Sequence, residues 1–324
     1  MKRNVLRKYV IGPSATIFLL TLAGQIPLHG QKDFSPLRPD LPTLSNTHAD
    51  ASIYLDFSFP RLKQAVPPLK GLAYESNQDQ LPSILAKVAQ SIADALPKLP
   101  DLISREDVYH SQSARDSLTA GGAVGSQPWS RQFRYLILCH HDSDGGVWIE
   151  ESRADGKGRP IDASGPSGTV TTPRGFGFAN QWLLFSAANQ PEFRFRYLGQ
   201  QTKDGKKTFV VAFAQSPEKV TTPANFQSDG KTVPFFLQGI LWIDQTTFDI
   251  VLLRTDLLAP IPGLHLFGLT TELHFAAVPI HDFDTVFWLP REVDISSDEG
   301  MGPVEENHRY SDYRLFHSTS KIIP

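Results

Sequence analysis

Two apolar segments in the second half of the chain decide the fold. They are Phe235-Phe-Leu-Gln-Gly-Ile-Leu-Trp-Ile-Asp244 and, after the turn Gln245-Thr-Thr247, Phe248-Asp-Ile-Val-Leu-Leu-Arg-Thr-Asp-Leu-Leu258. Each has the length of a β-strand, and the short turn between them predicts an antiparallel pair. Both faces of each strand are apolar, whereas an antiparallel sheet often presents one polar face to solvent. We therefore expect both faces of this pair to be covered.

The pair is part of a series of short apolar segments, separated by turns, that runs from residue 193 to residue 316. Its first two strands, Phe193–Gln201 and Lys207–Ala214, are joined at Asp204-Gly205, a dipeptide typical of tight hairpins. Because no helix-length segment separates the strands, they should pair antiparallel in one meandering sheet. Other strands are predicted at 270–278, 286–295 and 307–316, with weaker ones at 102–110, 132–140 and 146–154. The expected fold class is mainly β (α+β), a curved antiparallel half-barrel of about eight or nine strands.

One long amphipathic helix is predicted at 82–96, and a short second helix at 179–188. Pro82 suits the first turn of the long helix, and Pro97 ends it. Its apolar side chains form one stripe, made by Ile84, Leu85, Val88, Ile92, Ala95 and Leu96. Such a stripe must be buried, and the sheet is the available surface.

A single helix covers one face of the sheet, so the other face must meet a second layer or an apolar cavity. We expect Phe236, Ile240, Trp242 and Leu252 to line such a cavity, and closure of the sheet on its own side chains is the open alternative. Two apolar loops, at 257–269 and 176–185, are too hydrophobic for ordinary surface loops. They are expected to form a lid, which places Leu266, Phe267 and Trp182 beside a ligand; plain core packing is the alternative.

The N-terminal part of the chain predicts export. Residues 1–30 combine a basic start with an apolar stretch that is too short and interrupted for a spanning helix, which is typical of a signal peptide. A retained membrane anchor is the alternative. Residues 31–80 are rich in proline and are predicted to form an arm or linker ahead of a domain at 81–324. Within the arm, residues 53–59 could add to a sheet edge as a strand or simply lie over the domain.

Charge and motifs exclude several classes of function. Without residues 1–30 the chain keeps 27 basic and 34 acidic residues, a formal net charge of −7, which disfavours nucleic acid and anionic membrane surfaces as partners. Neither G-x-S-x-G nor H-E-x-x-H occurs, and Gly175-Phe-Gly177 lacks the third glycine of a dinucleotide site. In Cys139-His-His-Asp142, adjacent side chains on a strand point to opposite faces, which disfavours a metal site.

Glu151 and Arg153 are expected to face solvent. No catalytic residue, cofactor or metal is predicted, and we expect a protein that is not an enzyme.

Three segments resemble the outer-membrane lipoprotein carrier superfamily, the lipoprotein-sorting proteins. They are the strand pair Gly239–Asp244 with Phe248–Arg254, the strand entry Trp288-Leu-Pro-Arg291, and the closing strand Tyr310-Ser-Asp-Tyr-Arg-Leu-Phe316. The resemblance implies a half-barrel with helices on its concave side, and a function in moving acyl chains through the periplasm. The chain also resembles uncharacterised exported bacterial proteins. The proline-rich arm and an insertion at 156–190 depart from a minimal carrier, and no cargo-binding residue is transferred.

These observations lead to two expectations of function. The first is an exported, periplasmic binding protein that holds an acyl chain, a lipid or a lipoprotein anchor in an apolar cavity. The alternative is a structural or interaction protein of the cell envelope with no small ligand, whose partner binds residues 31–80. In both, no transmembrane span remains after signal cleavage.

Overall fold

The computed structural model describes residues 53–113, 127–141, 147–161, 178–221, 223–228, 231–280, 283, 286–298 and 302–316. The predicted signal peptide, the arm up to residue 52, Gly175–Gly177 and Asp142 lie outside these residues.

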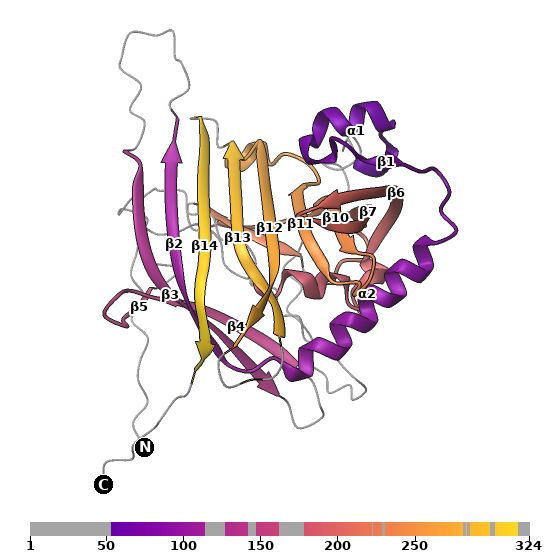
Figure 1. The fold of residues 1–324 in the computed structure, drawn as a ribbon. Helices are drawn as coiled ribbons and strands as arrows, with labels where there is room; N and C mark the ends of the chain where they lie inside the picture. The colour runs from indigo at the N-terminus through magenta and orange to yellow at the C-terminus, as the bar shows by residue number, and fades with distance from the viewer. Residues whose placement is uncertain are drawn as a thin grey trace, which may run out of the picture.

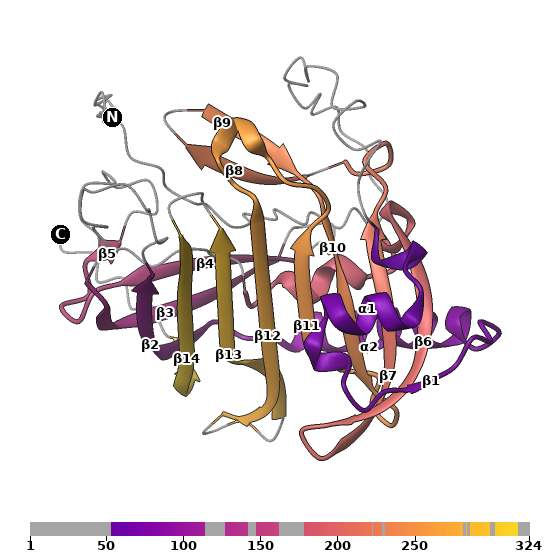
Figure 2. The ribbon, with the colours of Figure 1, turned by 90° about the horizontal axis from the view of Figure 1, so that it is seen from above.

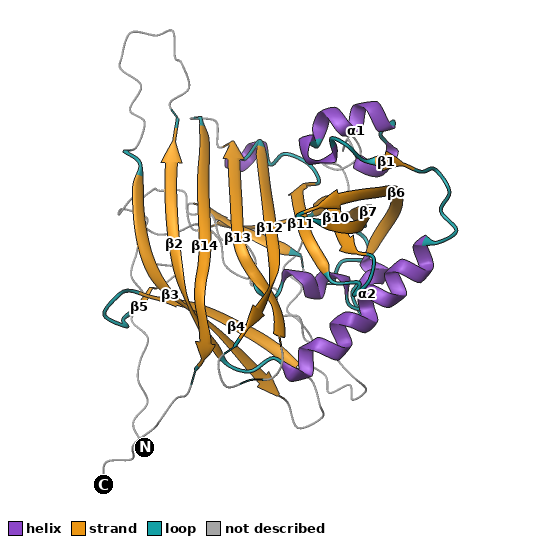
Figure 3. Cartoon of the chain, viewed as in Figure 1, coloured by secondary structure: helices purple, strands orange, loops and turns teal. Residues whose placement is uncertain are grey.

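A single antiparallel sheet forms the body of the described chain (Figures 1 and 3). It has twelve strands, in the spatial order β1 (Ala73–Tyr74), β6 (Phe193–Lys203), β7 (Lys206–Gln215), β10 (Leu237–Asp244), β11 (Ile250–Leu257), β12 (Gly268–Pro279), β13 (Val286–Asp298), β14 (Pro303–Leu315), β2 (Leu102–Gln112), β3 (Trp129–His141), β4 (Val147–Ala154) and β5 (Pro160–Ile161). A separate hairpin is formed by β8 (Ala224–Ser228) and β9 (Lys231–Phe235).

The predicted fold class is confirmed, because the sheet is open and every neighbouring pair is antiparallel. The decisive pair is β10 and β11, where Trp242 lies opposite Leu252. The sheet is larger than the expected eight or nine strands. Two of the added strands, β1 and β5, have two residues each, too few to show a strand period in the sequence.

The helices are α1 (Phe59–Ala65), α2 (Leu81–Ala95) and the 3₁₀ turns η2 (Tyr54–Asp56), η3 (Pro67–Leu69), η4 (Leu96–Lys98), η5 (Gln181–Phe185), η6 (Gln190–Glu192) and η7 (Pro262–Leu264). The long helix α2 lies where the sequence predicts it, and the predicted short second helix is the 3₁₀ turn η5. In α2 the buried side chains are Ile84, Val88, Ala89 and Ile92, so its apolar stripe is buried.

The two long faces of the sheet are covered by different segments. α2 and η5 lie on one face, here called the inner face, and α1 lies on the opposite, outer face (Figures 1 and 2). Alternation along β10 divides its side chains accordingly, with Leu241 and Ile243 in the inner core and Ile240 and Trp242 in the outer one. This explains why both faces of the strand are apolar.

Residues 53–80 are packed against the sheet, which differs from the predicted arm or linker. Tyr54, Phe57, Leu62, Val66, Leu69 and Leu72 are buried in the outer core. Residues 54–56 form η2 rather than an added strand, so this segment lies over the domain. The added strand is β1, at residues 73–74. Proline prevents regular ladders but does not prevent apolar side chains between the prolines from packing.

The edge of the sheet beside β1 has one protecting side chain. Gln78 Oε1 accepts the backbone N–H of Tyr197 at 2.7 Å, and Gln78 Nε2 donates to the carbonyl of Tyr197 at 3.0 Å. These are the two backbone groups of β6 that a further strand would otherwise bind.

Candidate functional site

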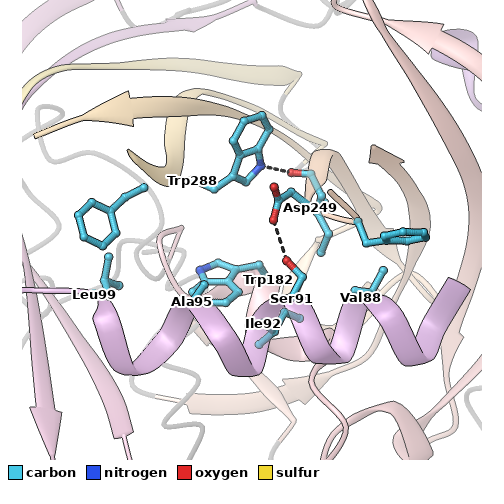
Figure 4. Close-up of a pocket in the computed structure, with 11 residues that line it drawn as sticks. Val88, Ser91, Ile92, Ala95, Leu99, Trp182, Asp249 and Trp288 are labelled. Atoms are coloured by element: carbon cyan, nitrogen blue, oxygen red, sulfur yellow. Dashed lines mark hydrogen bonds between the residues drawn. The ribbon is translucent and has the colours of Figure 1, made fainter. Parts of the chain in front are cut away.

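A small apolar cavity lies between α2 and the inner face of the sheet (Figure 4). Its volume is about 40 Å³, little more than the ~30 Å³ that one water molecule occupies in the liquid. We call it the α2 cavity; it is lined by Val88, Ser91, Ile92, Ala95, Leu99, Trp182, Phe248, Asp249, Ile250, Phe287 and Trp288.

Hydrogen bonds of a few side chains hold the walls of the cavity together. Ser91 Oγ, on α2, donates to Asp249 Oδ1 at 2.7 Å, and Trp288 Nε1 donates to the carbonyl of Ile250 at 2.6 Å. Gln190 Nε2 donates to the carbonyl of Leu85 at 2.9 Å. The remaining contacts between α2 and the sheet are mainly those of apolar side chains, which have no directional requirement.

An open groove of about 650 Å³ adjoins the cavity and shares Ser91, Ala95, Phe248, Asp249, Phe287 and Trp288 with it. We call it the α2 groove. Its other lining residues are Lys87, Gln90, Asp94, Lys98, Lys206, Thr247, Ala277 and Val286. The groove therefore has apolar walls and a charged rim, and it leads from solvent to the α2 cavity.

Phe248 stands at the boundary between cavity and groove in a strained backbone conformation. Its φ is 62°, in the left-handed region that bulky residues avoid. The turn is held by Asp244, whose carbonyl accepts the N–H of Phe248 and whose carboxylate accepts the N–H groups of Thr246 and Thr247. The Phe248 ring contacts Phe209, with ring centroids 6.0 Å apart. The turn thus fixes an aromatic ring in the wall of the site.

No family model matches the chain. No curated protein matches it. Among solved structures the chain is similar to a DUF1329 family protein from Desulfovibrio piger, with 10% identity, a TM-score of 0.40, and coverage of 75% of this chain and 95% of that one. It is also similar to a putative outer membrane lipoprotein-sorting protein domain from Vibrio parahaemolyticus, with 12% identity, a TM-score of 0.38, and coverage of 73% and 94%.

The structure separates the residues that the sequence groups as one ligand site. Trp182 lines the α2 cavity. Ile240, Trp242 and Leu252 lie on the outer face, fully buried under residues 54–72, so they line neither the cavity nor the groove. The reason is that β10 and β11 are apolar on both faces, and the sequence pattern cannot say which face meets α2.

The three other predicted ligand residues lie elsewhere. Phe236 packs with Ala214 and Leu258 in a small separate cluster. Leu266 is buried in the inner core, whereas Phe267 is 44% exposed. None of the three lines the α2 cavity or the α2 groove.

The sequence did not single out Phe248, Asp249 and Phe287 as site residues. Phe248 and Asp249 belong to the turn after β10, and their role depends on the position of α2, more than 150 residues earlier in the chain. Trp288 was noted only for its resemblance to a known strand entry. The sequence signal that could have indicated this site is the presence of aromatic residues in the turn, at Phe248, and at the start of β13, at Phe287 and Trp288.

The opposite end of the inner face holds a buried ion network instead of a cavity. Glu106 accepts hydrogen bonds from Arg153 Nε at 2.5 Å, Arg153 Nη2 at 2.7 Å and Tyr310 at 2.8 Å. His308 contacts Glu106 at 2.9 Å and Glu306 at 3.2 Å, and Glu306 also contacts His110 at 2.8 Å. These residues are almost completely buried.

Electrostatics in the network shift several pKa values. Burial alone would raise the pKa of Glu106, but Arg153 and His308 lower it to about 2. Burial would lower the pKa of His308, but Glu106 and Glu306 raise it above its usual value. Burial raises the pKa of Glu151 to about 7, although its carboxylate accepts the N–H groups of Ala179 and Asn180.

The expectation that Glu151 and Arg153 face solvent is wrong, because Arg153 is 1% exposed and the half-buried Glu151 carboxylate accepts the N–H groups of Ala179 and Asn180. Both residues lie on the inner face of β4. Segments distant in the sequence cover this face, so the sequence of β4 alone does not show that it is buried. Charged residues that alternate along a strand therefore do not show that this face meets solvent, because the charges can have buried partners.

The described part of the chain contains no group of three or more His, Cys, Asp or Glu side chains that could hold a metal ion. His140 stacks on Trp148, with ring centroids 3.9 Å apart, and its Nε2 contacts Glu150 at 2.9 Å. Among the described helices, none has the length and apolar composition needed to cross a membrane.

Proposed function

We propose that the protein is an exported, non-enzymatic binding protein that holds an acyl chain, as part of a lipid or a lipoprotein anchor, under α2. The observation that carries the proposal is the α2 cavity, an apolar space beneath a helix that is continuous with an open groove. The pattern of residues 1–30 supports export, and a periplasmic location is part of the proposal.

Binding of an acyl chain requires no chemical step. Each methylene group that is transferred from water into an apolar site contributes about 0.8 kcal/mol. A chain of about twelve carbons would therefore offset the loss of freedom on association by contact alone. Ligand pockets for molecules of this size generally have about 300–1,000 Å³.

The α2 cavity has about 40 Å³, so α2 must move away from the sheet when a chain enters. Two features favour such a movement. Prolines stand at both ends of the helix, Pro82 in its first turn and Pro97 just beyond it. The contacts that must separate are mainly apolar, apart from the hydrogen bonds of Ser91 with Asp249 and of Gln190 with the carbonyl of Leu85.

A substitution that fills the site tests this function. Ala95 lines both the cavity and the groove, and its side chain is exposed, so Ala95→Trp should block entry without disturbing the core. We expect native mass spectrometry of residues 31–324, purified from a bacterial periplasm, to show a co-purifying lipid mass that Ala95→Trp reduces at least about tenfold.

Ala93→Trp is the matched control, because Ala93 is exposed on the same helix and lines neither space. This variant should retain the lipid. The proposal fails if the unsubstituted protein carries no lipid and binds none after incubation with phospholipids and acylated peptides.

A further inference from the structure

We propose that the ligand of the α2 groove is a lipid-like molecule with an anionic headgroup, which Lys87, Lys98 and Lys206 hold at the mouth of the groove. This inference rests on the proposed function and adds to it the chemical class of the headgroup.

The three lysines occupy both sides of the groove. Lys87 and Lys98 are eleven positions apart in α2 and η4, about three helical turns, and both line the groove. Lys206 begins β7 on the opposite side. The ammonium of Lys87 lies 4.6 Å from the centroid of the Phe248 ring, and that of Lys206 lies 5.0 Å from the Trp288 ring. Because these rings form the apolar wall, two ammonium groups stand where the wall meets solvent.

Two of these lysines are available to an anion. In the described residues Lys87 contacts the Phe248 ring but forms no salt bridge, and Lys98 likewise forms none. Two carboxylates also line the groove, and each accepts a hydrogen bond from a neutral group: Asp94 from Gln90 at 2.8 Å and Asp249 from Ser91 at 2.7 Å. Lys206 forms a salt bridge with Asp244 at 2.5 Å. Among the described residues no carboxylate forms a salt bridge with Lys87 or Lys98, so an anionic headgroup would supply a direct partner for these two ammonium groups.

The arrangement separates the two parts of an amphiphile. Ala95, Phe287 and Trp288 continue from the groove into the α2 cavity, so the apolar tail has a path under the helix. The headgroup would remain between the lysines at the rim. Because residues 31–324 carry a formal net charge of −7, the protein as a whole is repelled by an anionic membrane, and direct contacts with the lysines of the rim would have to hold the headgroup.

The test compares three amphiphiles that share a twelve-carbon chain: dodecyl phosphate, dodecyl maltoside and dodecyltrimethylammonium. Each is titrated below its critical micelle concentration into residues 31–324, and its Kd is measured by calorimetry. We expect the phosphate to bind roughly five- to tenfold more tightly than the maltoside, and the ammonium more weakly than both. The preference for phosphate should decrease at about 0.5 M salt, because partly exposed charges are screened.

Substitution of the lysines tests whether they cause the preference for dodecyl phosphate. In Lys87→Gln/Lys98→Gln the phosphate and the maltoside should bind within about twofold of each other. Lys70→Gln/Lys219→Gln is the matched control, since both lysines are exposed and neither lines the groove. It should keep the full preference for phosphate. Inorganic phosphate, which has no chain, should not displace dodecyl phosphate at the same concentration.

The outcomes distinguish this inference from the proposed function. Equal affinity for the three amphiphiles would overturn the anionic headgroup and leave acyl-chain binding in place. A preference that persists in Lys87→Gln/Lys98→Gln would overturn the assignment to these lysines. Displacement by inorganic phosphate would overturn the lipid-like class, and no binding of any amphiphile would overturn the proposed function together with this inference.

Discussion

The two ends of the inner face are built on the same sheet but are held together by different forces. At one end α2 is held by apolar contacts with the sheet, by the hydrogen bond between Ser91 and Asp249, and by the hydrogen bond from Gln190 to the carbonyl of Leu85. At the other end Glu106, Arg153, His308 and Glu306 form a buried network of charged and hydrogen-bonding side chains. Apolar surfaces can separate and close again on a ligand, whereas separating buried charges without water leaves each of them unpaired. In the proposed function a ligand would enter at the α2 end, while the network end would keep its shape.

The largest expected effect comes from breaking the network. Arg153→Met removes the guanidinium that donates two hydrogen bonds to Glu106 and leaves this buried carboxylate with only His308 and Tyr310, so the free energy of unfolding should fall by about 3–5 kcal/mol. Urea denaturation measures the change. Arg159→Met is the control, because the Arg159 side chain is 74% exposed in its pair with Asp155, and it should change stability by less than about 1 kcal/mol. A loss below about 1 kcal/mol in Arg153→Met would contradict the rigid character assigned to this end.

A smaller effect is expected from pH, and it should also arise at the network end. The pKa of Glu151 is about 7 in the folded protein, against 4.5 for a free glutamate, and that of His308 is raised above 6.5. A group with a raised folded pKa stabilises the fold below its unfolded pKa and loses this effect as the pH rises through the folded value. The free energy of unfolding should therefore decrease from about pH 5 to above pH 7, by at most about 1.4 kcal/mol per pH unit for each group.

At acid pH the free energy of unfolding should change in the opposite direction, decreasing as the pH falls. The pKa of Glu106 is lowered to about 2, so its stabilising effect should be lost as the pH falls from 4.5 towards that value. Denaturation at a series of pH values should place the maximum near pH 5. His308→Gln should reduce the slope above pH 6.5, and His265→Asn, at an exposed position, should leave it unchanged. A stability that increases steadily from pH 5 to pH 8 would be inconsistent with these pKa shifts.

The smallest expected effect concerns the α2 end. Ser91→Ala removes the hydrogen bond to Asp249 and should lower stability by about 1 kcal/mol. Because this bond holds the helix over the cavity, the variant should bind dodecyl maltoside with a faster association rate, measured by stopped-flow fluorescence. Ser83→Ala, at an exposed position of α2 without a capping hydrogen bond, corrects for the helix preference of alanine. If the two variants associate at the same rate, the hydrogen bond does not control opening.

The elements with a strong local period could be predicted from the sequence, and these make up most of the sheet. The hairpin at Asp204-Gly205, the pair β10–β11 and the helix α2 lie at the predicted places. The placement of residues 53–80 could not be predicted, because the density of proline hides the apolar side chains that pack on the outer face. The pairing of β14 with β2 joins residues about 200 positions apart, and no local pattern records it.

The candidate site was predicted less well for a physical reason. Trp182 lines the α2 cavity, whereas Trp242, a large apolar residue in a strand that is apolar on both sides, lies in the outer core. The Trp242 side chain has its own partner on the outer face, where its Nε1 donates to Gln201 at 2.8 Å. Phe248 is in the site because of a turn with positive φ, and a turn of this kind has no signature when its residue is not glycine.

Gln78 shows how one side chain can take the place of a neighbouring molecule. An amide side chain carries the same donor and acceptor as a peptide bond, so by binding both backbone groups of Tyr197 it closes the point at which a strand of a second copy would start to pair. With Glu at position 78 the carbonyl of Tyr197 would have no donor, and β6 would become a template for intermolecular sheets. At this edge a single amide side chain therefore occupies the backbone groups of Tyr197 that a strand of another molecule would need.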